Sequence, residues 1–200
     1  MALELIKGAS LLLALSFLYS FLYRLGQKNK MIFDIAAGLL FGGICVVGMV
    51  TPLVISPGVI FDARSVVLSI SGLFGGPVVG SIALGIAAGY RYYIGGGGVG
   101  VGITVIASCV LMGLVYRYLH SKHKVKVDFF RLLAFGVLVH LVEISIFTQL
   151  PDDVVDKVMD NVALPLLLVF SPAIVRRDNQ SERAASIKMR MPSVGTVGRA

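Results

Sequence analysis

The sequence lacks most of the residues from which enzymes and metal sites are built. It has two cysteines and three histidines, and neither Cys45 nor Cys109 has a histidine or a second cysteine at metal-ligand spacing. It contains no metalloprotease, nucleophile-elbow, kinase or cyclase motif. We therefore expect no catalytic residue, no metal ion and no cofactor. Both cysteines are interpreted as small packing residues within apolar segments.

Charge is also scarce, and long apolar runs take its place. Hydrophobic residues make up 56% of the 200 residues and charged residues only 14%, with 23 glycines in addition. A soluble domain has about 45–50% apolar residues even when glycine is counted. The composition therefore predicts an integral membrane protein. The net charge of +7 comes from basic residues in loops beside apolar segments. We interpret it as a topology signal and expect no nucleic-acid partner.

Six segments have the length and composition of membrane helices, which need about 20 mostly apolar residues. They are residues 3–23, 35–55, 77–94, 99–119, 129–150 and 158–175. The first is interpreted as a retained helix, because no small-residue cleavage site follows it. The stretch 62–74 is apolar but shorter. It is expected to be a short tilted span or one limb of a re-entrant hairpin that closes at Gly75-Gly76-Pro77. The predicted fold class is thus an all-α membrane bundle of six long helices plus one short or re-entrant helix.

The loop charges predict the orientation of these segments. Basic loops are expected on the cytoplasmic side, which places the N-terminus outside and the C-terminus inside. The stretch 62–94 must then enter the membrane and return to the outer face, which would gather Asp62, Arg64 and Arg91 there. The basic loop residues are Arg24, Lys28 and Lys30 after the first segment and Lys122, Lys124 and Lys126 after the fourth, whereas four aspartates and one lysine lie in 151–160.

Charged residues within apolar segments are costly, so they are the first candidates for a functional site. Asp62 either caps a helix or belongs to a site. Arg64 either snorkels to the headgroups, pairs with Asp62, or offers its guanidinium to an anionic ligand. Arg91 is either an interfacial anchor or faces a polar site together with Arg64. The sequence alone leaves each of these alternatives open.

Glycines and one polar pair complete the candidate site. Gly75-Gly76-Pro77 predicts a turn followed by a helix start, and the run 95–98 predicts a flexible hairpin but not a phosphate loop. His140 and Glu143 are three residues apart, so they share a helix face and form either an interhelical hydrogen bond or part of a polar site. The candidate ligand-binding residues are Asp62, Arg64, Ser65, Gly75, Gly76, Tyr90, Arg91, Gly95, Gly96, His140 and Glu143.

Residues 35–175 resemble the LytS/YhcK-type five-transmembrane receptor domain of bacterial signalling proteins. Glu143 departs from the pattern, because an apolar residue is more usual at that place. The motifs that carry the resemblance are Asp62-Ala63-Arg64-Ser65, Gly75-Gly76-Pro77, Tyr90-Arg91, the glycines 95–98, the helix from His140 to Leu150-Pro151, and the prolines Pro165 and Pro172 of the last segment.

The resemblance implies a membrane sensor domain in the bacterial cytoplasmic membrane. Such a domain would bind an extracellular or membrane-derived small ligand. It would relay the signal, as a homodimer, to a cytoplasmic histidine kinase or cyclic-di-GMP domain or to a partner kinase. The implied organisation is a first helix and loop at 1–34, the sensor domain at 35–175, and a polar cytoplasmic tail or truncated connector at 176–200. The alternative is a solute-binding transport component similar to the S components of energy-coupling transporters.

Overall fold

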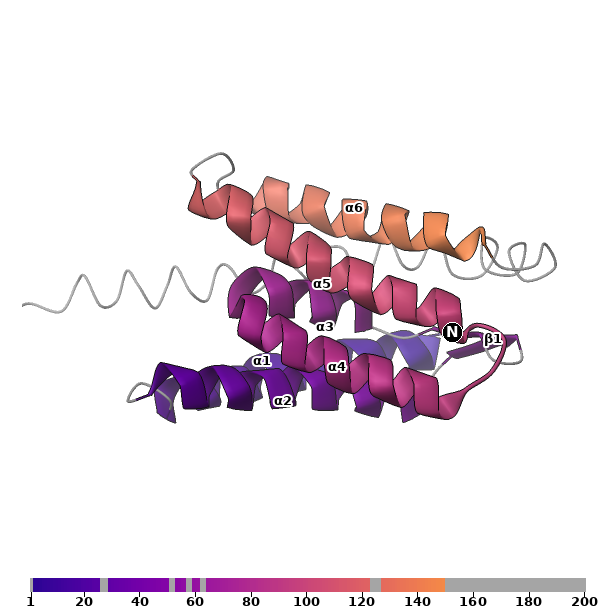
Figure 1. Ribbon diagram of the computed structural model, residues 1–200, viewed down its shortest axis with the longest axis horizontal. Helices are drawn as coiled ribbons and strands as arrows, with labels where there is room; N and C mark the ends of the chain where they lie inside the picture. Colours follow the sequence, from indigo (N-terminus) through magenta and orange to yellow (C-terminus); the bar gives the residue numbers. More distant parts are fainter. Residues whose placement is uncertain are drawn as a thin grey trace, which may run out of the picture.

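The computed structural model describes residues 2–25, 29–50, 53–56, 59–61, 64–122 and 127–149. Figure 1 shows the long helices running side by side, with a short helix enclosed among them. The elements in chain order are α1 (Ala2–Leu25), α2 (Lys30–Val50), β1 (Leu53–Ser56), β2 (Val59–Phe61), α3 (Arg64–Ile70), its π-helical continuation η2 (Ser71–Gly75), α4 (Pro77–Ile94), α5 (Val99–Ser121) and α6 (Phe129–Phe147).

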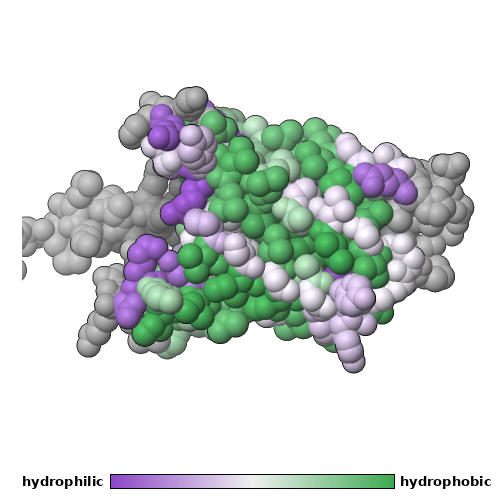
Figure 2. All heavy atoms as spheres, in the orientation of Figure 1, coloured by the Kyte–Doolittle hydropathy of each residue, from purple (hydrophilic) through white to green (hydrophobic). Residues whose placement is uncertain are grey.

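The predicted membrane helical bundle is confirmed. Among the described residues, three helices are long and apolar enough to cross a membrane, namely α2, α5 and α6. Large apolar side chains such as Leu39, Leu111 and Leu138 are exposed on them, as expected for surfaces that face lipid. Figure 2 shows these hydrophobic side chains as a green region across the middle of the molecule, with hydrophilic side chains toward its ends. The predicted segment 158–175 lies outside the described residues.

One feature of the fold was not predicted, a β-hairpin between α2 and α3. Helix α2 ends at Val50, whereas the apolar run had suggested a helix to residue 55. Strands β1 and β2 pair antiparallel, with Leu53 opposite Phe61. In the sequence, Pro52 and Pro57 stand on either side of β1. Proline lacks a backbone N–H and disfavours helix in the residue before it, so the run cannot continue as a helix although it remains apolar.

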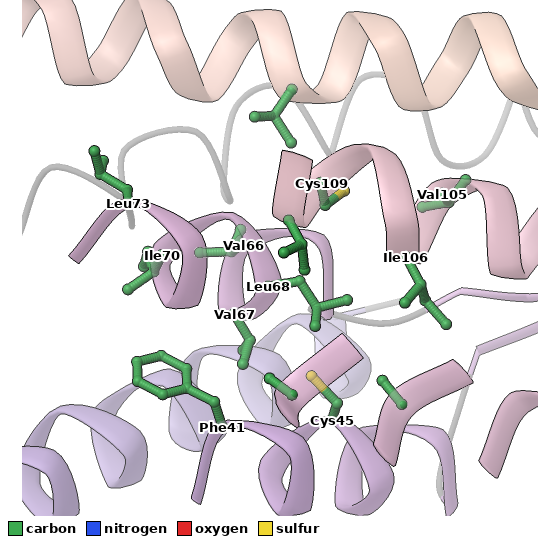
Figure 3. Packing of buried hydrophobic residues seen from close by; sticks show 14 of the residues in the cluster. Phe41, Cys45, Val66, Val67, Leu68, Ile70, Leu73, Val105, Ile106 and Cys109 are labelled. Atoms are coloured by element: carbon green, nitrogen blue, oxygen red, sulfur yellow. The ribbon is translucent and has the colours of Figure 1, made fainter. Parts of the chain in front are cut away.

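Helix α3 occupies the centre of the bundle. Every residue of α3 is buried, as are the first three residues of η2. The helix packs against α2, α4, α5 and α6, which explains why its sequence is apolar on all sides. Figure 3 shows Val66, Val67 and Leu68 between Phe41 and Cys45 of α2 and Val105 and Ile106 of α5. The 12 residues of α3 and η2 extend about 18 Å, roughly half of a bilayer.

We call α3 and η2 together the central helix. It ends in the predicted turn. Gly76 has φ 86°, a conformation that suits glycine, and Pro77 begins α4, where a missing N–H has no cost. The turn lies against Arg117, close to the end of α5 that leads to Lys122, which we call the Lys122 end of the bundle. From there α4 runs back to the loop at residues 95–98, the glycine-loop end (Figure 1). The stretch 64–94 therefore descends through about half of the bundle as α3 and returns as α4.

Small residues allow the helices to approach closely. A Cβ on Gly72 of η2 would lie 2.5 Å from the carbonyl oxygen of Val110, and a Cβ on Gly113 of α5 would collide with the carbonyl oxygen of Ser69. Both oxygens belong to the backbone, so neither can make room for a Cβ by a change of side-chain rotamer. The backbones of the central helix and α5 are thus in direct contact, as in close helix pairs within membranes.

Gly113→Ala is expected to destabilise the bundle, because the new methyl group must push the central helix away from α5. Overpacking of this kind costs about 1–3 kcal/mol. Thermal unfolding of the detergent-solubilised protein measures the loss. The matched control is Gly85→Ala on α4, where a Cβ would meet no described heavy atom within 4 Å. Equal melting temperatures for the two variants would contradict the backbone contact.

Candidate functional site

A cluster of polar side chains lies inside the bundle where α3, α5 and α6 meet. It consists of Arg64 and Ser65 from α3, Cys109 from α5, and His140 and Glu143 from α6. Each of the five is at most 3% exposed. Arg64 and Glu143 both lie close enough to the Cys109 thiol to act on it electrostatically, and Ser65 lies near the thiol, although its Oγ makes no hydrogen bond to a described residue. We call these five residues the polar cluster.

The polar cluster holds charges of opposite sign. The side chain of Glu143 is 2% exposed, and its Oε2 lies 3.3 Å from Nδ1 of His140. The guanidinium of Arg64 acts on the same thiol as Glu143 but comes from a different helix. A single charge at membrane depth is costly, and a nearby opposite charge offsets part of that cost. The predicted His140–Glu143 pair is therefore part of a larger arrangement that joins α6 to the central helix.

The residues of α5 show how the contacts with the other helices are spaced along the bundle. Its residues Gly102, Cys109, Gly113 and Arg117 are separated by seven, four and four positions, so they lie along one helix face. They contact, in the same order, Arg91, the Arg64 region, the backbone of Ser69, and the carbonyl of Leu73. Cys109 is the eleventh of the 23 residues of α5. The polar cluster thus lies near the middle of the bundle.

Arg91 lies at the glycine-loop end, away from the polar cluster. Its Nη1 donates a hydrogen bond of 2.8 Å to the carbonyl oxygen of Gly95, which closes the C-terminus of α4. A Cβ on Gly102 would lie 2.6 Å from its Nε. Gly102 is two helical turns, about 10 Å, from Cys109 along α5. Arg91 thus meets α5 at Gly102, whereas Arg64 acts on Cys109. That Arg64 and Arg91 gather at one face stays a prediction.

The other predicted site residues belong to the two turns. Gly95 and Gly96 have φ angles of 74° and 92°, which favour glycine. Tyr90 is half-buried with its ring 6.2 Å from that of Tyr93. Gly75 lies against Val79, and a Cβ on Gly76 would lie 3.2 Å from the Arg117 guanidinium. Asp62 lies outside the described residues.

Arg117 holds the C-terminal end of the central helix and was not among the predicted site residues. Its Nη1 donates to the carbonyl oxygens of Leu73 at 3.0 Å and Phe74 at 3.1 Å. These carbonyls end the helix formed by α3 and η2, where the helix dipole favours a cation. Arg117 therefore fixes the position of the central helix relative to α5 at the Lys122 end.

Cys109 was interpreted from sequence as a packing residue, whereas in the structure two charged side chains, Arg64 and Glu143, lie close enough to act on its thiol. No sequence signal could have shown this, because α3, α5 and α6 meet only in the folded chain. Within the described part of the chain, no three His, Cys, Asp or Glu side chains are grouped to hold a metal ion. The polar cluster offers a guanidinium fork, a hydroxyl, a thiol, an imidazole and a carboxylate, which suit recognition of a small polar molecule.

Comparison with known proteins gives one family. The family model described as 5TMR of 5TMR-LYT matches residues 16–175. No match was found among curated proteins or among solved structures. The matched range contains all five residues of the polar cluster, both glycine turns and Arg117.

Removing both charges of the polar cluster is expected to destabilise the protein less than the sum of the two single removals. Arg64→Met removes the guanidinium, and Glu143→Gln removes the charge of the carboxylate, that act on the Cys109 thiol. Removing one of two opposite buried charges costs about 3–5 kcal/mol. The double variant should regain part of that loss, with a coupling energy of about 1–3 kcal/mol. Thermal unfolding of the four proteins measures it. Strictly additive losses would show that the two charges do not compensate each other.

Proposed function

The chain belongs to the 5TMR-LYT family, and from this premise we propose that it is a membrane sensor domain whose polar cluster binds a small ligand and whose bundle relays that binding to a cytoplasmic output domain. The observation that carries the proposal is the convergence of polar residues from three helices at one buried level. A bundle that only had to be stable would fill this level with apolar side chains, because buried polar groups cost free energy. Ionisable residues at membrane depth are functional candidates by default.

The proposed ligand carries an anionic group such as a carboxylate or a phosphate. Arg64 presents a planar fork of N–H donors that matches these groups. Ser65 lies on the same helix and Cys109 faces it from α5, so a hydroxyl and a thiol are available beside the fork. His140 and Glu143 would contact the remaining polar atoms of the ligand. Glu143 stands where the resembling family usually has an apolar residue, which makes it a candidate determinant of ligand choice in this chain.

The proposed orientation follows the loop charges. The glycine-loop end faces outside and the Lys122 end faces the cytoplasm. An extracellular ligand would then enter from the end that carries the β-hairpin and the loop at residues 95–98. The output is a histidine kinase or a cyclic-di-GMP domain on the cytoplasmic side, and the domain acts as a homodimer in the bacterial cytoplasmic membrane. The domain limits 1–34, 35–175 and 176–200 remain part of this proposal.

A transport component is the second candidate, and one observation favours it. The central helix begins near the middle of the bundle beside polar residues, and half-length helices that begin at mid-membrane are a feature of solute transporters. The two candidates differ in the fate of the bound molecule. A sensor binds its ligand without moving it, whereas a transport component carries solute across the membrane, alone or with an energising partner.

Binding at Arg64 is expected to raise the melting temperature of the protein in lipid nanodiscs. Spent bacterial growth medium is separated into fractions of small molecules, and each fraction is added to the nanodiscs as a probe. A ligand present at 100 times its Kd adds about 2.7 kcal/mol to stability, which is a shift of several degrees. Arg64→Gln should lose the shift. Arg131→Gln, which removes an exposed arginine paired with Asp128, should keep it. A full shift in Arg64→Gln would exclude the polar cluster as the site.

Uptake separates the two candidates. Any fraction that raises the melting temperature is added to the solution outside proteoliposomes. The amount of the active compound inside them is then measured by mass spectrometry. We expect no uptake above that of protein-free liposomes. Uptake that is lost in Arg64→Gln would favour the transport component.

A further inference from the structure

The central helix ends in a π turn, η2, whose first three residues are buried. Helix α3 passes into η2 without a break, since Ile70 at the junction has helical φ and ψ angles of −65° and −40°. A π turn closes i→i+5 hydrogen bonds, whereas an α turn closes i→i+4 bonds. The π turn therefore holds one more residue than an α turn between the same two ends. Such turns are frequent at functional sites.

The two ends of this helix are held differently. At the Lys122 end, Arg117 binds the carbonyls of Leu73 and Phe74, and the Gly76 turn fixes the chain. At the other end, Arg64 and Ser65 lie in the polar cluster near the Cys109 thiol. With the Arg117 end held, a change in the π turn would move Arg64 and Ser65.

The size of that change follows from helix geometry. If η2 became α-helical with its lower end fixed, every residue before it would advance by one position. One position is a rotation of about 100° and a rise of about 1.5 Å. Val66 would then take the place of Ser65 beside Cys109, and Arg64 would turn away from the level of Glu143. The two arrangements are discrete, because packed helices do not take intermediate positions.

Two serines supply hydrogen bonds beside the turn. Oγ of Ser69 donates to the carbonyl oxygen of Val66 at 3.0 Å, and Oγ of Ser71 donates to that of Leu68 at 2.7 Å. Both bonds are buried. In membranes, serine hydroxyls and local π adjustments satisfy carbonyls that an irregular helix would otherwise leave without donors. Carbonyls next to the turn thus have a donor that does not depend on the helix register.

We propose that the π turn Ser71–Gly75 is the conformational switch of this sensor, and that it holds the central helix in one of two registers. In the register of the structure, Arg64 and Ser65 lie in the polar cluster. In the other, η2 is α-helical and Val66 faces Cys109. The proposal rests on the polar cluster being the ligand site, since a ligand that contacts Arg64 binds the two registers with different affinity and so shifts their populations.

Disulfide trapping tests the register directly. In a Cys45→Ala background, Cys109 is the sole native thiol, and Ser65→Cys or Val66→Cys adds one thiol on the central helix. After oxidation with copper phenanthroline and denaturation, maleimide–polyethylene glycol labels two thiols in unlinked molecules and none in linked ones. We expect S65C to link to Cys109 at least fivefold more than V66C.

Changes of chain length show whether the turn absorbs a residue. Deletion of Ser71 should keep the preference for S65C, because an α turn takes up the missing residue. Insertion of one alanine after Ser71 should reverse the preference in favour of V66C, because the turn is already wide. If the deletion removes S65C linking as fully as the insertion does, the two-register helix is wrong.

A substitution gives the same information without altering chain length. Ser71→Ala removes a hydroxyl bond beside the π turn and should raise the V66C share of linking at least twofold. Ser145→Ala on α6 is the control, since its Oγ makes a similar bond to the carbonyl of Leu141 in an ordinary α-helix. An unchanged ratio in Ser71→Ala would count against the switch.

A fused histidine-kinase reporter, exposed to the spent-medium fractions, separates this proposal from the proposed function. The deletion of Ser71 should fix the phosphorylation level whether or not the fractions are present. If the deletion variant responds like the unmodified chain while Arg64→Gln does not respond, the site stands and the switch is wrong. If Arg64→Gln responds like the unmodified chain, the proposed site itself is wrong.

Discussion

The close crossing of the central helix and α5 is the constraint on which the rest of the structure depends. Gly72 and Gly113 bring the two backbones into contact, with no room for a side chain at either position. This contact fixes the depth of a helix that is too short to span a membrane. Because α3 starts a fixed number of residues before the crossing, Arg64 and Ser65 reach the level of Cys109. The position of the polar cluster is therefore a consequence of the crossing at Gly72 and Gly113, which lie about two turns from Ser65 and one turn from Cys109.

A buried guanidinium then determines its surroundings. Arg64 begins a helix that holds no acidic residue, so its charge must be offset from outside α3. Glu143 on α6 supplies the opposite sign at the same level, and His140 holds the carboxylate from one turn away. The polar cluster thereby joins α6 to the centre of the bundle through electrostatics, whereas α2 and α4 join it through apolar and small-residue contacts.

The sequence predicted the membrane bundle, the limits of α4, the turn at Gly76 and the pair His140–Glu143, because each depends on local composition or on helical spacing. It did not predict the β-hairpin, since Val54 and Ile55 are as apolar as a helix end and only the flanking prolines differ. It also did not predict how deep Arg64 lies in the bundle. The loop charges show which side a segment starts from, but the depth of a half-length helix depends on a crossing with a helix some forty residues later. For the same reason, Cys109 and Arg117 acquire their roles only in three dimensions.

The burial of α3 also explains why this helix, and not a longer one, is suited to move. Helices α2, α5 and α6 expose apolar side chains at their surfaces, so shifting them along the membrane normal would mismatch those side chains with the hydrocarbon layer, at a cost for every ångström. The central helix exposes none of its residues, and a one-residue change of register leaves the lipid-facing surface as it was. The free-energy difference between the two registers is then set by contacts inside the bundle, which are the packing of the buried α3 side chains and the contacts of Arg64 with the polar cluster. A ligand that contacts Arg64 acts on the second of these two parts.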